Sequence, residues 1–299
     1  MASAFILSGL PDYVEVHKDE LLTKATLDFV TAKYVDIMPN VKFKDAIPTL
    51  DSEITLQDGS QCGFNPTGTD EFGEKFVETH AVKVEKEWCY KDWEKKYGNY
   101  QLLWEAGRET LPFEEKLTNH NLGLIQEAVE ELAWQGDSGL SIDGFIKDIT
   151  VNESASTINV SGVTSADTIV EKVDKVVAAV PMSALKKGVN VYMSANNLRK
   201  YILALNATCC ANRPIQDAAA ETFGYLGDSR VTLVAVYGIG DSYIVAAPAD
   251  ALIWATDVEN SENRYRLWFD EKDEMFRLRV LFRAGTAIRR GDEVAYASI

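Results

Sequence analysis

The sequence predicts a mixed α+β fold organised around one long helix. Three observations support this prediction: a helical pattern of apolar residues over 112–135, an alternation of helices and strands over 167–247, and a strand-like alternation within 264–299. This order of elements indicates that late strands return to the earlier helix. At 299 residues, the chain is long enough for about two domains and a sizeable core.

The N-terminal part contains one short amphipathic helix on an otherwise irregular segment. Apolar side chains recur at helical spacing between residues 16 and 35, and the pattern ends near Met38-Pro39. These apolar residues are Leu21, Leu22, Ala25, Phe29, Val30 and Tyr34.

A projecting hairpin is predicted next. Residues 53–56 and 76–84 favour strands, and the stretch 57–70 between them is rich in Gly, Asn, Pro and Thr. Two strands with a long polar tip have too few large apolar residues to hold a core of their own. We therefore expect the apolar positions of this hairpin to pack on something else.

The strongest helical pattern covers residues 112–135. Thr110 can cap this helix, Pro112 suits its first turn, and Gly136 can end it. Its apolar residues recur at helical spacings along a rod of roughly 36 Å. They are Phe113, Leu117, Leu124, Ile125, Ala128, Val129, Leu132 and Ala133. A glycine-bearing loop, 136–145, follows the helix.

An α/β unit follows the loop. Branched apolar residues predict a helix over 167–180, the run 189–193 predicts a buried strand, and Ser194 can cap a further helix. Residues 231–237 and 243–247 then favour two strands. The sequence Gly-Ile-Gly-Asp between these strands is a turn signal typical of a β-hairpin.

The last strand has one apolar face and one arginine-rich face. Its pattern alternates apart from Leu281. The apolar positions are Phe276, Leu278, Val280 and Phe282. The positions between them that carry arginine are Arg277, Arg279 and Arg283.

Charge divides the chain into two halves. The whole chain has 30 Lys and Arg against 46 Asp and Glu, a net charge of −16, and residues 1–150 hold 14 basic and 28 acidic residues of these. So acidic a chain is not expected to grip DNA, RNA or anionic lipid, because phosphate binding depends on clustered Lys and Arg. Seven of the eleven arginines lie in 264–299, which suggests complementary surfaces within one molecule or between copies. A solvated acidic face explains the same charges equally well.

No catalytic constellation can be assembled from the sequence. Gly136-Asp-Ser138-Gly matches the serine-nucleophile signature of trypsin-like proteases, but none of the three histidines has the sequence context of that family. The spacing of the histidines and cysteines predicts no metal site, and no cofactor is implied. No run approaches the roughly 20 apolar residues that cross a membrane. We therefore expect a structural or binding protein and no enzyme; in the competing interpretation, a small soluble hydrolase, Ser138 is the only candidate nucleophile.

Several passages of the chain occur in a recognisable order after the hairpin. They are Leu132-Ala-Trp-Gln-Gly-Asp137, Asp143-Gly144-Phe145, Val189-Asn-Val-Tyr-Met-Ser194, Tyr243-Ile-Val-Ala-Ala-Pro248, and Arg279-Val-Leu-Phe-Arg-Ala-Gly285-Thr-Ala-Ile288. Together with the hairpin and the long helix, they resemble the major capsid protein of tailed phages, the Hong Kong 97 fold. The resemblance extends over nearly the whole chain and rests on the order of elements more than on fixed residues.

The resemblance implies a division of the chain into five parts. They are an N-terminal arm (1–50), an extended loop (51–92), a peripheral domain with a spine helix at about 112–135 (93–180), an axial domain (181–263), and strands that return to the peripheral domain (264–299).

The implied function is that of a shell subunit. Many copies would self-assemble into hexamers and pentamers of an icosahedral capsid that encloses the double-stranded DNA genome, without sequence-specific contact to that DNA. The chain would be found in the virion, after assembly in the host cytoplasm. A separate scaffolding protein, a portal and decoration proteins are the possible partners. An encapsulin-type nanocompartment shell is the alternative within the same fold.

The charge division adds a set of candidate contacts between subunits. We expect carboxylates of the extended loop to meet arginines of the last strand on a neighbouring copy. These candidates are Glu71, Glu74, Glu78, Arg277, Arg279 and Arg283.

Overall fold

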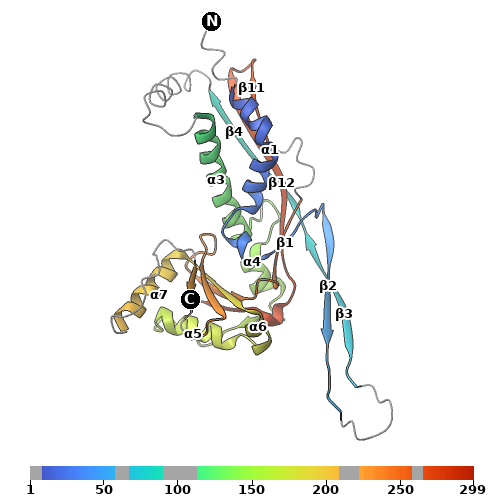
Figure 1. The fold of residues 1–299 in the computed structure, drawn as a ribbon, viewed down its shortest axis with the longest axis vertical. Coiled ribbons are helices and arrows are strands. Elements are labelled where there is room, and N and C mark those ends of the chain that lie inside the picture. Colours follow the sequence, from blue (N-terminus) through green and yellow to red (C-terminus); the bar gives the residue numbers. More distant parts are fainter. Residues whose placement is uncertain (1–8, 58–66, 90–112, 209–221, 226, 258–264) are drawn as a thin grey trace.

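The computed structural model describes residues 9–57, 67–89, 113–208, 222–225, 227–257 and 265–299 (Figure 1). Within these residues the chain forms two large sheets with their helices and a two-stranded ribbon that projects from the body. This mixture of helices and strands confirms the predicted α+β class. Thr110 and Pro112, the expected start of the long helix, lie outside the described residues.

Strands from the end of the chain pair in one sheet with strands from its beginning, as the predicted order of elements requires. The α-helices of the described residues are α1 (Gly9–Leu27), α3 (Phe113–Gln135), α4 (Gly144–Lys147), α5 (Ile169–Ala179), α6 (Met182–Lys187) and α7 (Ala195–Thr208). Short helical turns cover Thr31–Lys33, Asp148–Asn152 and Gly291–Glu293, the second of them π-helical.

The strands are β1 (Asp36–Met38), β2 (Lys44–Ser52), β3 (Asp70–Glu78), β4 (His80–Cys89), β5 (Ile158–Asn159), β6 (Val189–Met193), β7 (Thr222–Gly224), β8 (Val231–Ala235), β9 (Tyr243–Ala247), β10 (Leu252–Thr256), β11 (Tyr265–Asp270), β12 (Met275–Ile288) and β13 (Ala295–Ser298).

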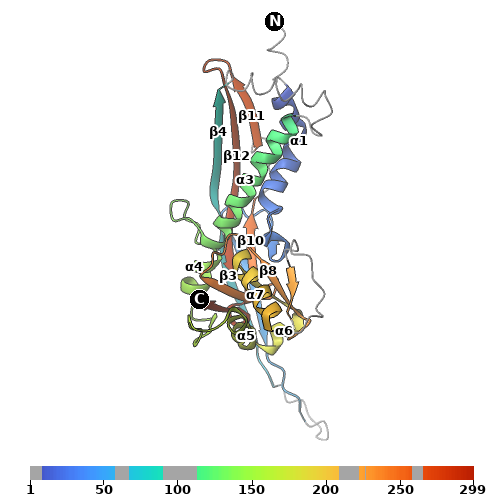
Figure 2. The same ribbon diagram turned by 90° about the vertical axis from the view of Figure 1, so that its left-hand side faces the viewer.

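Helices α1 and α3 lie side by side against a five-stranded sheet (Figure 2). Its strand order is β1-β10-β12-β11, and β4 pairs with the other edge of β12. The predicted alternation along β12 is confirmed, because its four large apolar side chains, Phe276, Leu278, Val280 and Phe282, are all buried. They join the side chains of α1 and α3 in the larger core of the molecule.

The first helix is shifted relative to its predicted range of 16–35. Helix α1 begins at Gly9 and ends at Leu27, and the chain then makes a short turn before β1. Phe29 and Ala32 remain buried after the helix has ended. A tertiary contact explains this, because the backbone N–H of Thr31 donates a hydrogen bond to the carboxylate of Glu130 on α3.

The second sheet has six strands in the order β5-β13-β9-β6-β8-β7, and helices α5 and α7 pack against it. Strand β6 confirms the predicted run 189–193, and the Ser194 hydroxyl caps α7 by accepting a hydrogen bond from Asn197 N at 3.1 Å. Two elements lie across the expected domain limits. Helix α5 belongs to the core of this second sheet, whereas β10 pairs within the first sheet.

The predicted hairpin between β8 and β9 is wrong. Strand β6 lies between them, parallel to β8 and antiparallel to β9. The turn signal marks a connection that passes over the end of α3, where Gly238 O accepts a hydrogen bond from Gln135 Nε2 at 3.0 Å. A Cβ at Gly238 would lie 2.2 Å from Glu130 O, so glycine is needed for this close approach to the helix.

The projecting ribbon consists of β2 and β3, paired from Lys44↔Glu78 to Ser52↔Asp70 (Figure 1). Its first strand therefore precedes the predicted strand at 53–56, which has no regular structure. The predicted strand over 76–84 is two strands, separated at Thr79. The chain exchanges β2 for β12 as its pairing partner at this residue.

Candidate functional site

The ribbon is attached to the body at its root. Ile47 and Val77 are fully buried there against side chains of β10 and β12. Lys75 Nζ lies 2.8 Å from Glu153 Oε2, and Thr79 N donates a hydrogen bond to Phe43 O at 2.8 Å. The expectation that apolar positions of the hairpin pack on another part of the protein is confirmed at this root.

Beyond the root, the ribbon exposes apolar side chains. Leu50 and Phe72 are directly opposite each other in the ladder, so both side chains lie on the same face of the ribbon. They are 49% and 84% exposed. Phe76 has the same parity along β3 and is also exposed, with Lys44 Nζ 4.6 Å from its ring centre. We call this the outward face of the ribbon.

The three candidate carboxylates of the loop do not share one face. Glu74 and Glu78 have the parity of Phe72 and lie on the outward face, whereas Glu71 lies on the opposite face. Glu78 pairs with Lys44 across the ladder at 2.7 Å, and this hydrogen-bonded contact lowers the pKa of Glu78. Glu74 is exposed opposite Pro48.

The candidate arginines of β12 all have partners within the same chain. Arg277 contacts Asp270, Asp273 and Glu87, and its distance to the Asp273 carboxylate is 2.6 Å. Arg279 Nε lies 2.9 Å from Glu85 Oε1 on β4. Complementary charge therefore joins β4 to β12 within one molecule.

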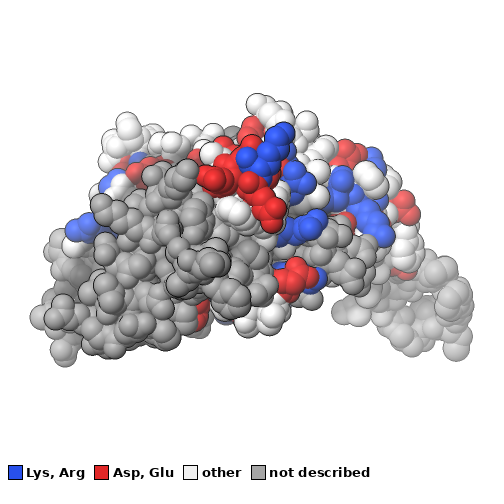
Figure 3. All heavy atoms as spheres, turned by 90° about the horizontal axis from the view of Figure 1, so that it is seen from above, with Lys and Arg blue, Asp and Glu red and all other residues white. Residues whose placement is uncertain are grey.

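Arg283 is half-buried at the root of the ribbon. Its Nη2 donates a hydrogen bond to Thr79 O at 2.6 Å, and its guanidinium carbon lies 4.3 Å from the centre of the Phe43 ring. The side chain thus supports the root of the ribbon. Figure 3, which looks onto the upper end of Figure 1, shows acidic and basic side chains intermixed over the described part of this surface.

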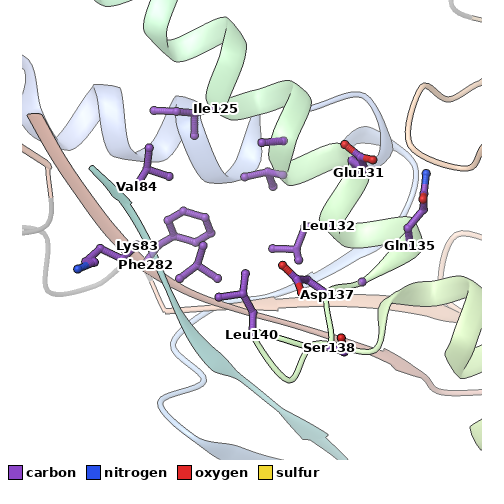
Figure 4. A pocket seen from close by; sticks show the side chains of 14 residues that line it. Lys83, Val84, Ile125, Glu131, Leu132, Gln135, Asp137, Ser138, Leu140 and Phe282 are labelled. Atoms are coloured by element: carbon purple, nitrogen blue, oxygen red, sulfur yellow. The ribbon is translucent and has the colours of Figure 1, made fainter. Parts of the chain in front are cut away.

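Ser138 lies in a turn after α3. It lines a cavity of about 600 Å³ whose wall is mostly apolar and includes Ile125, Leu132 and Phe282 (Figure 4). The neighbouring Asp137 accepts a hydrogen bond from Gly139 N at 2.7 Å and so stabilises the turn. No histidine or cysteine is among the described residues that line this cavity. The sequence Gly136-Asp-Ser138-Gly, which matches a protease signature, therefore forms a turn in this structure.

A buried carboxylate lies behind the root of the ribbon. Asp148 accepts hydrogen bonds from Thr286 Oγ1 at 2.6 Å and from Asn152 Nδ2 at 2.8 Å. Burial raises the pKa of Asp148 to about 6, and the nearby carboxylates of Asp143 and Glu153 act in the same direction. No sequence pattern marked this site, because its three carboxylates come together only through the fold of α4 and the π-helical turn.

The histidines and acids of the described ranges do not gather into a metal site. Within the ranges that the structure describes, no three His, Cys, Asp or Glu side chains are placed so that they could hold a metal ion. In the same ranges, no helix has the length and apolar character needed to span a membrane.

The fold is similar to solved capsid structures over nearly the whole chain. The procapsid of satellite phage P4, which includes the size determination (Sid) protein, has a TM-score of 0.63 at 9% identity, covering 93% of this chain and 89% of that chain. The capsid of an empty GTA particle has a TM-score of 0.55 at 12% identity, with coverage of 92% and 90%.

A virus-like particle from Pyrococcus furiosus has a TM-score of 0.51 at 10% identity, with coverage of 93% and 98%. No family model and no curated protein matches the sequence. The likeness therefore lies in the arrangement of the elements, and it supports the resemblance found in the sequence. The chain has the fold of the phage major capsid proteins.

Proposed function

We propose that this chain is the major capsid protein of a tailed phage, which self-assembles into hexamers and pentamers of an icosahedral shell around a double-stranded DNA genome. The observation that carries the proposal is the exposed apolar pair of Leu50 and Phe72 on a ribbon that extends beyond the body. An isolated subunit gains no stability from these side chains, whereas a neighbouring subunit would remove them from water. The fold shared with capsid structures supports the same function.

The proposal assigns each part of the fold to a part of a capsid subunit. The five-stranded sheet with α1 and α3 is the peripheral domain, with α3 as its spine helix. The six-stranded sheet with its helices is the axial domain. The ribbon is the extended loop, and residues 1–50, expected to be the N-terminal arm, contribute α1 to the peripheral domain and most of β2 to the ribbon. The expected limits of these parts, 51–92, 93–180, 181–263 and 264–299, stay predictions.

The proposal also covers partners and location. The subunit acts without catalysis or cofactor, resides in the virion after assembly in the host cytoplasm, and encloses DNA without reading its sequence. Its net charge of −16 supports containment of DNA over strong adhesion to it. A separate scaffolding protein, a portal and decoration proteins are its proposed assembly partners.

Electron microscopy of the purified full chain tests the proposal. The chain is expressed alone and together with the proteins encoded beside it. Closed icosahedral particles are expected in at least one of these samples. A stable monomer or small dimer in every sample would contradict the proposal.

A nanocompartment shell of the encapsulin type is the second candidate, favoured by the similarity to the virus-like particle from Pyrococcus furiosus. The two candidates differ in what the particle holds. Nuclease-resistant double-stranded DNA of genome length inside particles from infected cells would support the phage capsid. Particles that hold protein cargo and no such DNA would support the nanocompartment.

A further inference from the structure

Two arginines face each other across neighbouring strands of the five-stranded sheet. Arg266 on β11 is directly opposite Arg279 on β12, and Arg279 is in turn directly opposite Glu85 on β4. The row therefore holds two positive charges and one negative charge. Like charges in directly opposite positions destabilise a sheet unless another group compensates them.

Arg266 is the uncompensated member of this row. Its side chain is exposed, and it forms no ion pair or hydrogen bond with any residue that the structure describes. Arg279, by contrast, has its carboxylate partner at 2.9 Å. A carboxylate placed over the row would meet Arg266 and would remove the repulsion between the two guanidinium groups.

A groove beside this row could receive an aromatic side chain next to that carboxylate. It has a volume of about 510 Å³, and its lining includes Trp268, Arg277 and Arg279. The guanidinium carbon of Arg279 lies 5.8 Å from the centre of the Trp268 ring. The surface therefore places two guanidinium groups beside a half-buried aromatic ring, and its lining also includes Lys86 and the carboxylates of Glu85 and Glu87.

The outward face of the ribbon has the complementary pattern. Glu74 lies between Phe72 and Phe76 along one face of β3, and all three side chains are exposed. Within the described residues, Glu74 forms no ion pair. The ribbon thus presents an acidic group flanked by aromatic rings, as the groove requires.

The same molecule cannot make this contact by itself. Strand β11 lies at the upper end of the molecule, and the ribbon projects from the lower end (Figure 1). A contact between two different surfaces of identical subunits is heterologous and can repeat around a closed ring.

We propose, on the basis of the proposed shell function, that Glu74 of one copy docks on the Arg266–Arg279 pair of a second copy. The flanking Phe72 lies against the groove beside Trp268 in this contact. The contact thereby assigns an intersubunit role to Arg266, and it selects Glu74 from the carboxylates of the ribbon. Glu71 points away from this partner.

A charge swap tests the contact in the full-length chain. Glu74→Arg and Arg266→Glu each place like charges together, and each is expected to raise the concentration at which particles form on the order of fivefold. The double variant restores opposite charges in exchanged positions. It is expected to assemble within about twofold of the wild-type concentration.

Two matched controls make the same changes of charge elsewhere. Glu71→Arg lies on the other face of the ribbon, and Lys272→Glu lies in the turn between β11 and β12. Both should assemble as the wild type does. Normal assembly of either test variant, or a double variant as defective as the single ones, would refute the contact while leaving the shell function intact. A wild-type chain that forms no particles would instead refute the shell function.

Discussion

The carboxylate of Glu130 holds Thr31 by two hydrogen bonds, one from the backbone N–H at 3.0 Å and one from the hydroxyl at 2.5 Å. Trp134 Nε1 donates to the same hydroxyl at 2.6 Å. These side chains are buried, and they join the middle of the chain to a turn that lies 99 residues earlier. Helix α3 thereby fixes the path between α1 and β1.

Glu130→Ala should therefore destabilise the folded monomeric chain. The change leaves the buried N–H of Thr31 without an acceptor, so we expect a loss of about 3 kcal/mol in the free energy of unfolding. Urea denaturation measures this loss. Glu131→Ala removes the adjacent exposed carboxylate and should change the stability by less than about 0.5 kcal/mol. Equal effects of the two substitutions would contradict a special role for Glu130.

Asp148 should make the stability of the subunit depend on pH. Its pKa is raised from 3.8 to about 6, so the folded state binds the proton more tightly than the unfolded state. The contribution of Asp148 to stability is therefore fully present below about pH 4 and is lost as the pH rises through about 6. Asp148→Asn removes this dependence.

Relative to wild type, Asp148→Asn should gain about 2 kcal/mol of stability between pH 4 and pH 7. Asp148→Asn also alters the hydrogen bonds to Thr286 and Asn152. Any cost of this alteration that is the same at every pH cancels when the stability differences at the two pH values are compared. The matched variant is Asp167→Asn, because the hydrogen-bonded contact with Lys175 lowers the pKa of Asp167 to about 2 and Asp167 does not act on Asp148. Its stability relative to wild type should show no such gain over the same pH range. Parallel curves for Asp148→Asn and wild type would rule out the raised pKa.

Substitutions on the two faces of the ribbon should have different effects. A change on the buried face should lower the stability of the fold, and a change on the outward face should impair assembly. Val77→Ala removes buried methyl groups at the root and should cost about 2 kcal/mol in the free energy of unfolding. Phe72→Ser changes an exposed side chain, so the stability of the subunit should stay within about 0.5 kcal/mol of wild type. Denaturation and electron microscopy are compared for both variants. Phe72→Ser should abolish particles although it leaves the subunit folded, and normal particles would show that the outward face has no role in assembly.

Gly238→Ala should destabilise the subunit strongly. The added Cβ would lie 2.2 Å from the carbonyl oxygen of Glu130, so the connection between β8 and β9 would have to move away from α3. We expect a loss of more than about 2 kcal/mol, measured by thermal or urea denaturation. Gly224→Ala is the control, because its Cβ would meet nothing within 4 Å. A well-tolerated Gly238→Ala would show that this close approach is unnecessary.

Elements with strong local signals were predictable from the sequence. Helix α3 ends at Gln135 before Gly136, whose φ of +70° suits glycine, and β6 and β9 have their expected limits. The alternation along β12 also gave its buried face. Each of these signals depends on residues close together in the sequence.

Features that depend on distant partners could not be predicted in the same way. The turn between β8 and β9 resembles a hairpin locally, but the insertion of β6 between them is a property of the whole sheet. Strand β2 has few apolar residues and contains Pro48, so its pattern does not mark a strand. The importance of Arg266 emerges only from its register opposite Arg279.

The separation of the ribbon from the sheets at Thr79 has a mechanical consequence. Four hydrogen bonds hold this residue: its N–H donates to Phe43 O, its hydroxyl donates to Val41 O and accepts from Arg283 Nε, and its carbonyl accepts from Arg283 Nη2. Strand pairing changes partner there, and beyond Thr79 the buried side chains of Ile47 and Val77 still tie the root of the ribbon to the body. A small change of angle between the root and the body would therefore move the distal end of the ribbon through a much larger distance. In the proposed shell, such a lever would let one chain meet neighbours at different angles.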